Sequence, residues 1–161
     1  MDFLKNIVTG SGLALLGGVL AAILGGWGSS IGVSKVGKVA TGVLAEDPSL
    51  YGKALIMQAL PATQGIYGLL VWFMIMLQAG FLDGTYSQLS MEKGMIMFLA
   101  CLPCIFVLLP SAVKQAEVAA AGVQLLLKRP EEQSKALVMT AMVETYAIFA
   151  LLISVLVIML V

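Results

Sequence analysis

Charged residues are absent from three long stretches of this 161-residue sequence, and a fourth contains a single acid. The stretches cover residues 7–34, 54–82, 94–113 and 136–161, and the acid is Glu144 in the last of them. Each is at or above the roughly 18 residues that a helix needs to cross the hydrocarbon core of a bilayer. The pattern predicts an all-α membrane protein with four transmembrane helices.

The polar connections between these stretches are short. They contain residues 46–49, 83–87 and 128–132, and turn residues such as Pro48, Gly84 and Pro130 mark them. Short connections make neighbouring helices antiparallel, and no segment is long enough for a separate soluble domain. We therefore expect one transmembrane domain over residues 1–161.

An internal repeat divides the chain. At a shift of 82 residues, Gly-Lys-Ala-Leu-Ile-Met at 52–57 aligns with Ser-Lys-Ala-Leu-Val-Met at 134–139, and Pro48 aligns with Pro130. The chain is predicted to be two tandem fused helical hairpins, residues 1–80 and 81–161, with the same orientation. This repeat argues against a cleaved signal peptide at the first span and against alternating access by inverted halves. Ala62 occupies the position that aligns with Glu144.

Composition narrows the class of protein further. Hydrophobic residues make up 60% of the chain and charged residues 11%, which leaves too little polar surface for a soluble domain. The nine basic residues balance nine acidic ones, so there is no electrostatic footprint for nucleic acid. There is no histidine, so a histidine proton relay is excluded.

Glu144 is the residue with the strongest functional implication. Burying an ionised acid at membrane depth costs about 3 kcal/mol on insertion scales, so such residues generally face a protein interior or a wet cavity. A carboxylate in that position can bind and release a cation or a proton as its surroundings change. The position of Glu144 predicts ion transport.

Oxygen-bearing side chains at a similar depth suggest what Glu144 binds. Leu60, Thr63, Gln64 and Tyr67 share one helical face, and Gln64, Gln115 and Glu144 lie at similar distances from the loop prolines. Hydroxyl, amide and carboxylate oxygens suit a hard cation, and one carboxylate balances one positive charge. The set favours Na+. A proton would need only Glu144, and the polar groups would then merely bond the helices together.

Small residues recur every four positions in the first helix, at Gly18, Ala22, Gly26 and Ser30. Small faces permit close contact between helices. Two interpretations stay open: generic packing inside one bundle, or a crowded inner wall where the first helices of many copies meet.

Three segments together resemble a known family. They are Leu-Pro-Ala-Thr-Gln-Gly-Ile-Tyr-Gly at 60–68, Val-Ala-Ala-Ala-Gly at 118–122 and Met-Val-Glu-Thr-Tyr-Ala-Ile at 142–148. With them, nearly the whole chain resembles the proteolipid rotor-ring subunit of V-type ATPases, especially the sodium-pumping bacterial form.

The resemblance implies a homo-oligomeric ring of identical copies that turns in the lipid, driven by a separate ATP-hydrolysing head. The chain itself would hydrolyse nothing. A membrane stator subunit would supply an Arg, and a central-stalk subunit would meet the hairpin turns. The implied Na+ ligands are the Glu144 carboxylate, the Thr63 hydroxyl, the Gln64 and Gln115 amides and the Leu60 backbone carbonyl. Tyr67 matches the tyrosine that steadies the ionised glutamate.

One departure from the family pattern lies beside Gln115. Lys114 and Glu117 flank this position, where the family usually has small or uncharged residues before its glutamine and often Gly-Lys after it. Lys114 is expected to pair with Glu117 at i+3 and to point away from the ion. A Lys114 that faced Glu144 would displace the cation.

Basic residues predict the orientation in the membrane. Seven lie toward the two hairpin turns and two lie at the opposite end: Lys35, Lys38, Lys53, Lys114, Lys128, Arg129 and Lys135 against Lys5 and Lys93. This bias favours cytoplasmic hairpin turns with both termini outside, and the resemblance implies a bacterial plasma membrane.

Other function classes compete with the sodium rotor. A proton-carrying rotor subunit would share the architecture, a small secondary transporter would need a substrate pathway within one or two copies, and a structural connector would tolerate Glu144→Gln. Cys101 and Cys104 form a CxxC spacing, but they surround Pro103 in an apolar helix without nearby His or acid. We interpret them as packing residues.

Overall fold

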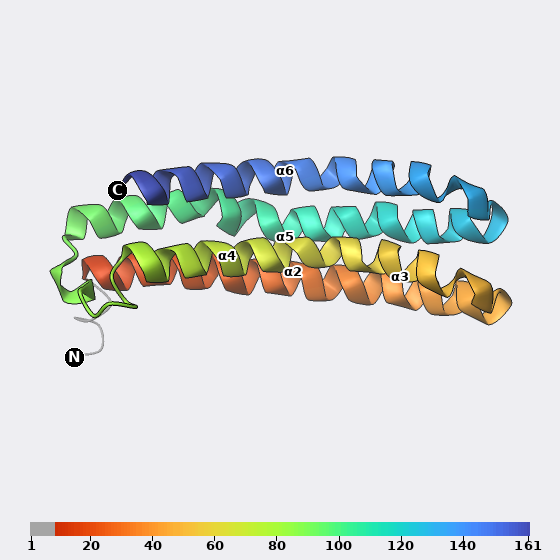
Figure 1. Cartoon of the computed structure of the whole chain (residues 1–161), viewed down its shortest axis with the longest axis horizontal. Coiled ribbons are helices and arrows are strands. Elements are labelled where there is room, and N and C mark those ends of the chain that lie inside the picture. The colour runs from red at the N-terminus through yellow and green to blue at the C-terminus, as the bar shows by residue number, and fades with distance from the viewer. Residues whose placement is uncertain (1–8) are drawn as a thin grey trace.

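A computed structural model describes residues 9–161, and every long element in that range is a helix (Figure 1). The elements in chain order are α2 (Gly10–Glu46), η1 (Pro48–Leu50), α3 (Tyr51–Ala59), η2 (Leu60–Ala62), α4 (Thr63–Gln78), η3 (Tyr86–Gln88), α5 (Met91–Lys128), η4 (Pro130–Glu132) and α6 (Gln133–Leu160). The η elements are single 3₁₀ turns. Lys5, Ile7 and Val8, which belong to the sequence predictions above, lie outside the described residues.

The helices form two antiparallel hairpins laid side by side. The turn from α2 to α3 and the turn from α5 to α6 lie at one end of the bundle, while the connection from α4 to α5 lies at the other (Figure 1). Four segments of the described chain are long and apolar enough to cross a membrane: Gly10–Glu46, Pro48–Gln78, Met91–Lys128 and Pro130–Leu160. The predicted fold of four helices in two fused hairpins is confirmed.

The helices extend well beyond the uncharged stretches. Helix α2 has 37 residues and α5 has 38, so each is roughly 55 Å long at about 1.5 Å per residue. The hydrocarbon core is about 30 Å thick, so both helices also carry the charged segments that follow the apolar stretches. The first charged residue after each apolar stretch therefore does not mark the end of the helix.

The two hairpin turns are built differently although they occupy equivalent positions. Asp47 caps η1 by accepting hydrogen bonds from the Ser49 backbone N–H at 2.9 Å and the Ser49 hydroxyl at 2.6 Å. Arg129 stands at the equivalent position before η4 and makes no side-chain capping bond. The turns are joined because Lys53 Nζ donates to the Pro130 carbonyl at 2.8 Å.

Helices α2 and α5 make the most extensive contact in the molecule, while α3 and α4 pack on α2 and α6 packs on α5. Glycine makes the central contact possible. A Cβ added at Gly28 would lie 2.6 Å from the Leu109 Cα, and one added at Gly32 would lie 3.0 Å from the Ala112 carbonyl. Close packing within the chain therefore explains part of the small-residue pattern.

Two small residues of the predicted stripe on α2 are not used in this way. Gly26 and Ser30 are exposed, and a Cβ added at Gly26 would meet nothing within 4 Å. Gly18, on the same predicted stripe, is buried against Ile75 and Trp72. The stripe thus divides between intramolecular packing and an uncovered face.

The three prolines within the apolar stretches have different effects. Pro61 lies in η2, a 3₁₀ turn that separates α3 from α4. Pro103 and Pro110 lie inside α5, which continues through both. Each proline removes one backbone N–H donor, but only at Pro61 does the α-helix give way to a 3₁₀ turn.

Candidate functional site

Glu144 lies in the middle of α6, half-buried, and both of its carboxylate oxygens have partners on other helices. The Tyr67 hydroxyl on α4 donates to Oε1 at 2.6 Å, and Gln115 Nε2 on α5 donates to Oε2 at 3.2 Å. Hydrogen bonds to an ionised acceptor are stronger than neutral ones and stabilise its charge. Three helices therefore meet at this carboxylate.

Behind Glu144, two glutamine side chains are fully buried and bonded to one another. Gln64 Nε2 donates to Gln115 Oε1 at 2.8 Å, and the exposed fraction of both residues is 0%. A buried amide without partners is costly, so this pairing fixes both side chains in place. It links α4 to α5 at the depth of Glu144.

Thr63 and Leu60 complete the group. The Thr63 hydroxyl lies 3.0 Å from the Leu60 carbonyl and 3.4 Å from Gln64 Oε1. Leu60 begins the 3₁₀ turn at Pro61, and Thr63 begins α4. All six residues predicted from the sequence are thus joined in one hydrogen-bonded network: Leu60, Thr63, Gln64, Tyr67, Gln115 and Glu144.

The amide orientations decide which atoms face the carboxylate. Gln115 turns Nε2 toward Glu144 and also toward the Thr140 carbonyl, at 3.4 Å, while its Oε1 accepts from Gln64. Gln64 directs its own Oε1 toward Thr63. For Gln115 to ligate a cation through its oxygen beside Glu144, its amide group must turn. The structure therefore differs in this detail from the ligand arrangement that the resemblance implies.

Sequence reasoning missed two residues that support the network. Ser111 Oγ accepts from Gln64 Nε2 at 3.3 Å, and the Thr140 carbonyl accepts from Gln115. Ser111 precedes Gln115 by four residues and Thr140 precedes Glu144 by four, so each lies one helical turn away on the same face. That spacing was a signal from which both could have been found.

The chemistry available at this site is that of oxygen ligands around one negative charge. Among residues 9–161, no three His, Cys, Asp or Glu side chains gather in a metal-binding group. Carbonyl, hydroxyl, amide and carboxylate oxygens from α4, α5, α6 and η2 are what the site offers. Such a set suits a hard cation of low charge.

Lys114 points away from this network. Its Nζ lies 3.1 Å from Glu117 Oε2, the predicted i+3 pair, and Lys35 Nζ on α2 lies 3.4 Å from Glu117 Oε1. The Lys114 side chain is 69% exposed, and it forms its ion pair with Glu117 rather than with Glu144. A lysine next to Gln115 in sequence is therefore compatible with a cation at Glu144.

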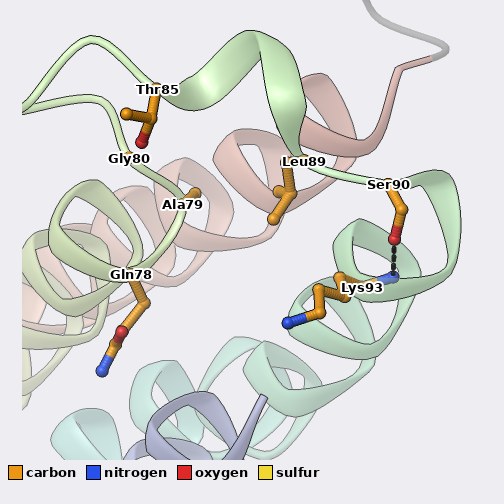
Figure 2. A pocket seen from close by; sticks show the side chains of 7 residues that line it. All are labelled: Gln78, Ala79, Gly80, Thr85, Leu89, Ser90 and Lys93. Carbon is orange, nitrogen blue, oxygen red and sulfur yellow. Dashed lines mark hydrogen bonds between the residues drawn. The ribbon is translucent and has the colours of Figure 1, made fainter.

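Two other features of the molecule are separate from the network. Cys101 and Cys104 are buried and free, in line with their interpretation as packing residues. A hollow of about 280 Å³ lies at the opposite end from the hairpin turns, lined by Gln78, Gly80, Ser90, Lys93 and their neighbours (Figure 2). Figure 2 shows the bond from the Lys93 N–H to Ser90 Oγ, which caps α5. None of the six network residues lines this hollow.

Fold and site together define a membrane proteolipid with duplicated hairpins and one carboxylate in the middle of its last apolar helix. The chain belongs to the ATP synthase C family, whose model matches it twice, over residues 16–75 and 98–157. The two matches are equal in length and 82 residues apart, which agrees with the repeat.

Two relatives are similar over most of the chain. The V-type sodium ATPase subunit K of Enterococcus hirae is 40% identical over 154 residues, covering 96% of this chain and 95% of that protein. The A-type ATP synthase subunit K of Methanocaldococcus jannaschii is 38% identical over 145 residues, covering 89% of this chain and 60% of that protein. The resemblance identified from the sequence motifs is confirmed.

Proposed function

We propose that this chain is the ion-carrying rotor-ring subunit of a rotary V-type ATPase and that each copy carries one Na+ at Glu144. The observation that carries the proposal is the network that joins the Glu144 carboxylate to Thr63, Gln64 and Gln115. The similarity to a subunit named for a sodium ATPase supports the choice of ion.

Charge balance supports one monovalent ion for each chain. Glu144 is the only acidic residue in the network, and its counterpart in the first hairpin is Ala62. One Na+ neutralises one carboxylate, whereas Ca2+ generally recruits more carboxylate ligands. The duplicated chain therefore carries one site where two separate hairpins, each with an acid, would carry two.

Neutralisation of the Glu144 carboxylate by the bound ion is what allows a subunit to rotate through lipid. A bare carboxylate is costly in lipid, so a copy whose Glu144 holds a cation enters the hydrocarbon more easily than an empty one. An Arg on a separate stator subunit would compete for the carboxylate and release the ion, because opposite charges attract more strongly at low dielectric. ATP hydrolysis belongs to a separate head, and a central-stalk subunit transmits it through the hairpin turns.

The basic residues support an orientation with these turns in the cytoplasm of a bacterial cell and both termini outside. Lys53, Lys128, Arg129 and Lys135 all lie at or next to the turns, which share one end of the bundle (Figure 1). Basic loops stay preferentially on the cytoplasmic side of a membrane. Both turns would then be accessible to the stalk.

A proton is the second candidate for the transported ion. The observation that favours it is the orientation of Gln115, which directs an N–H group and not an oxygen toward Glu144. A proton needs only the carboxylate, so no amide would have to turn. The architecture and the rotation would be the same.

Carbodiimide labelling of Glu144 separates the two ions, because this reagent modifies the protonated acid. We expect millimolar Na+ to protect Glu144 across a range of pH and K+ at equal ionic strength to give no protection. The variant Glu144→Gln should lose labelling, whereas Glu117→Gln should keep it. Labelling that depends on pH alone and ignores Na+ would contradict the sodium proposal and support the proton-carrying rotor.

A further inference from the structure

Helix α2 supplies none of the six network residues, yet its backbone packs against the start of α4, which carries Thr63 and Gln64. A Cβ added at Gly25 would lie 2.6 Å from the Gln64 carbonyl oxygen. A Cβ added at Gly32 would lie 2.7 Å from the Pro61 Cβ. Helix α2 is therefore in close contact with the 3₁₀ turn at Pro61 and with the start of α4 at Gln64.

The first turn of α4 has no cap of its own. The helix begins at Thr63, and the preceding residue, Ala62, makes no side-chain capping bond. The 3₁₀ turn already supplies one acceptor, because the Thr63 N–H bonds to the Leu60 carbonyl. A short polar side chain just before a helix usually accepts from its second or third N–H. Alanine cannot do so.

Ser29 on α2 provides the missing acceptor from another helix. The Gly65 N–H donates to Ser29 Oγ at 2.8 Å, and Ser29 is buried. Gly65 is the third residue of α4, where a capping side chain normally accepts its bond. A Cβ added at Gly65 would lie 3.2 Å from this same hydroxyl, so glycine keeps the approach close.

We propose that Ser29 is a positioning residue for the Na+ site: its hydroxyl caps α4 in place of Ala62 and holds the backbone that aims the Thr63 and Gln64 oxygens. Thr63 and Gln64 immediately precede the capped Gly65, so a change in this turn changes both oxygens together. This inference rests on the proposed Na+ binding at Glu144. It assigns to α2 a role in ion affinity besides helix packing.

Ser30 offers a matched control for Ser29. It is the next residue on α2, it is exposed, and its hydroxyl donates to the Trp27 carbonyl of its own helix at 2.8 Å. Replacing either serine by alanine removes the same atom from the same helix. Only Ser29→Ala removes a bond to α4.

The test compares Na+ protection of Glu144 from carbodiimide in the wild-type chain, Ser29→Ala and Ser30→Ala. Loss of a capping side chain typically lowers the population of the capped turn, and binding weakens by the same factor. We expect Ser29→Ala to need about fivefold more Na+ for half protection. Ser30→Ala should match the wild type. The pH profile of labelling without Na+ should be unchanged in both variants, because neither serine bonds to Glu144 or to its donors Tyr67 and Gln115.

The outcomes separate this inference from the proposed function. No Na+ protection in the wild type would overturn the sodium site itself. Protection that is normal in both the wild type and Ser29→Ala would leave the site in place and overturn the role of Ser29. A Ser29→Ala variant whose Na+-free pH profile also changes would contradict a role confined to the α4 turn.

A second measurement does not depend on how well the variant assembles. The amide proton of Gly65 in the wild-type protein should show the downfield NMR shift of a hydrogen-bonded group, with the mid-helix Gly68 amide as its reference. An upfield Gly65 amide, typical of a group without an acceptor, would overturn the proposal.

Discussion

The two hairpins have a common backbone plan, but their equivalent positions carry different chemistry. The second hairpin places Glu144 on an unbroken helix, whereas the first places Ala62 at the end of a 3₁₀ turn. At the same shift of 82 residues, Gln64 corresponds to the exposed Tyr146, and Gln115 corresponds to the apolar Val33. The molecule builds one site from complementary halves and does not repeat a site in each.

One side-chain hydrogen bond is present in both hairpins, and comparing its two copies shows why only the first hairpin contributes it to the Glu144 network. The Thr63 hydroxyl bonds to the Leu60 carbonyl at 3.0 Å, and its counterpart, the Thr145 hydroxyl, bonds to the Met142 carbonyl at 2.8 Å. The second copy of this bond lies on a regular helix and is exposed, whereas the first is partly buried. The local bond alone therefore does not bring a threonine into the Glu144 network. In the first hairpin a 3₁₀ turn and the buried Gln64 amide accompany it.

The largest expected effect comes from removing the charge that only the second hairpin carries. Glu144→Gln should reduce Na+ affinity by about 100-fold or more and abolish Na+ uptake by the assembled complex, because unit charges about 4 Å apart attract by several kcal/mol at an effective dielectric near 20. The matched control is Ala62→Gln at the equivalent position. Uptake of ²²Na+ into vesicles that remains in Glu144→Gln would contradict the assignment.

Adding an acid to the first hairpin tests whether the repeat conceals a second site. Ala62→Glu should impair pumping, because the residue equivalent to Gln115 there is Val33, which has no polar side chain. The new carboxylate therefore has no amide partner of the kind that Glu144 has. Equilibrium titration of the purified variant should still give about one Na+ per chain at the wild-type affinity. A value near two would show that both hairpins can form a site.

Gln64 and Tyr146 offer a comparison of equivalent positions with opposite burial. Gln64→Leu removes a ligand oxygen and leaves Gln115 Oε1 buried without its donor, so we expect Na+ affinity to fall by about 10- to 100-fold. Tyr146, which is 66% exposed, should tolerate Tyr146→Leu with unchanged affinity. Isothermal titration of Na+ into both variants measures the difference. Equal losses would argue against a special role for the buried amide.

A smaller effect is expected at Tyr67, whose counterpart in the second hairpin is Phe149. Tyr67→Phe removes the 2.6 Å bond to Glu144 and makes the two hairpins alike at this position. The carboxylate loses a donor that helps to hold it in place, so half protection from carbodiimide should need about three- to tenfold more Na+. Wild-type protection in Tyr67→Phe would show that the phenol does not support the site.

The smallest expected effect concerns the hairpin turns. The Ser49 hydroxyl and backbone N–H hold the pKa of Asp47 below its ordinary value of 3.8. This bond therefore stabilises the fold above about pH 4 and is lost as the pH falls through the lowered pKa. Asp47→Asn should lower the melting temperature by about 2 °C at pH 6 and by less near pH 3. Arg129→Asp copies only the backbone half of this cap, because Glu131 stands where the first turn has Ser49, so it should raise the melting temperature by less.

Much of the fold followed from the sequence because lipid restricts the choice of structure. Four apolar stretches with short polar connections leave few alternatives to helical hairpins. Depth estimates for Gln64, Gln115 and Glu144 were useful because Pro48 and Pro130, from which they were counted, mark turns at the same end of the bundle. Both arguments need only helical geometry.

Other features depend on contacts between helices that a linear pattern does not encode. Ser29 accepts a bond from a backbone N–H 36 positions away, so no side-chain pattern signals it. The orientation of the Gln115 amide depends on the Thr140 carbonyl, which any residue at position 140 would supply. At Pro61 the structure has a 3₁₀ turn, and the Gly65 N–H shortly after it donates to Ser29 on α2. Each detail becomes visible only when α2, α5 and α6 are packed around α4.

A high-resolution density map of the assembled protein in Na+, compared with one in K+, tests the central claim most directly. We predict an ion in the Na+ map, ligated by the Glu144 carboxylate, the Thr63 hydroxyl and the Gln64 oxygen, with the Gln115 oxygen turned toward it. The K+ map should lack this ion. A Glu144 side chain turned away from Gln64 and Gln115, with nothing held between them in abundant Na+, would contradict the account.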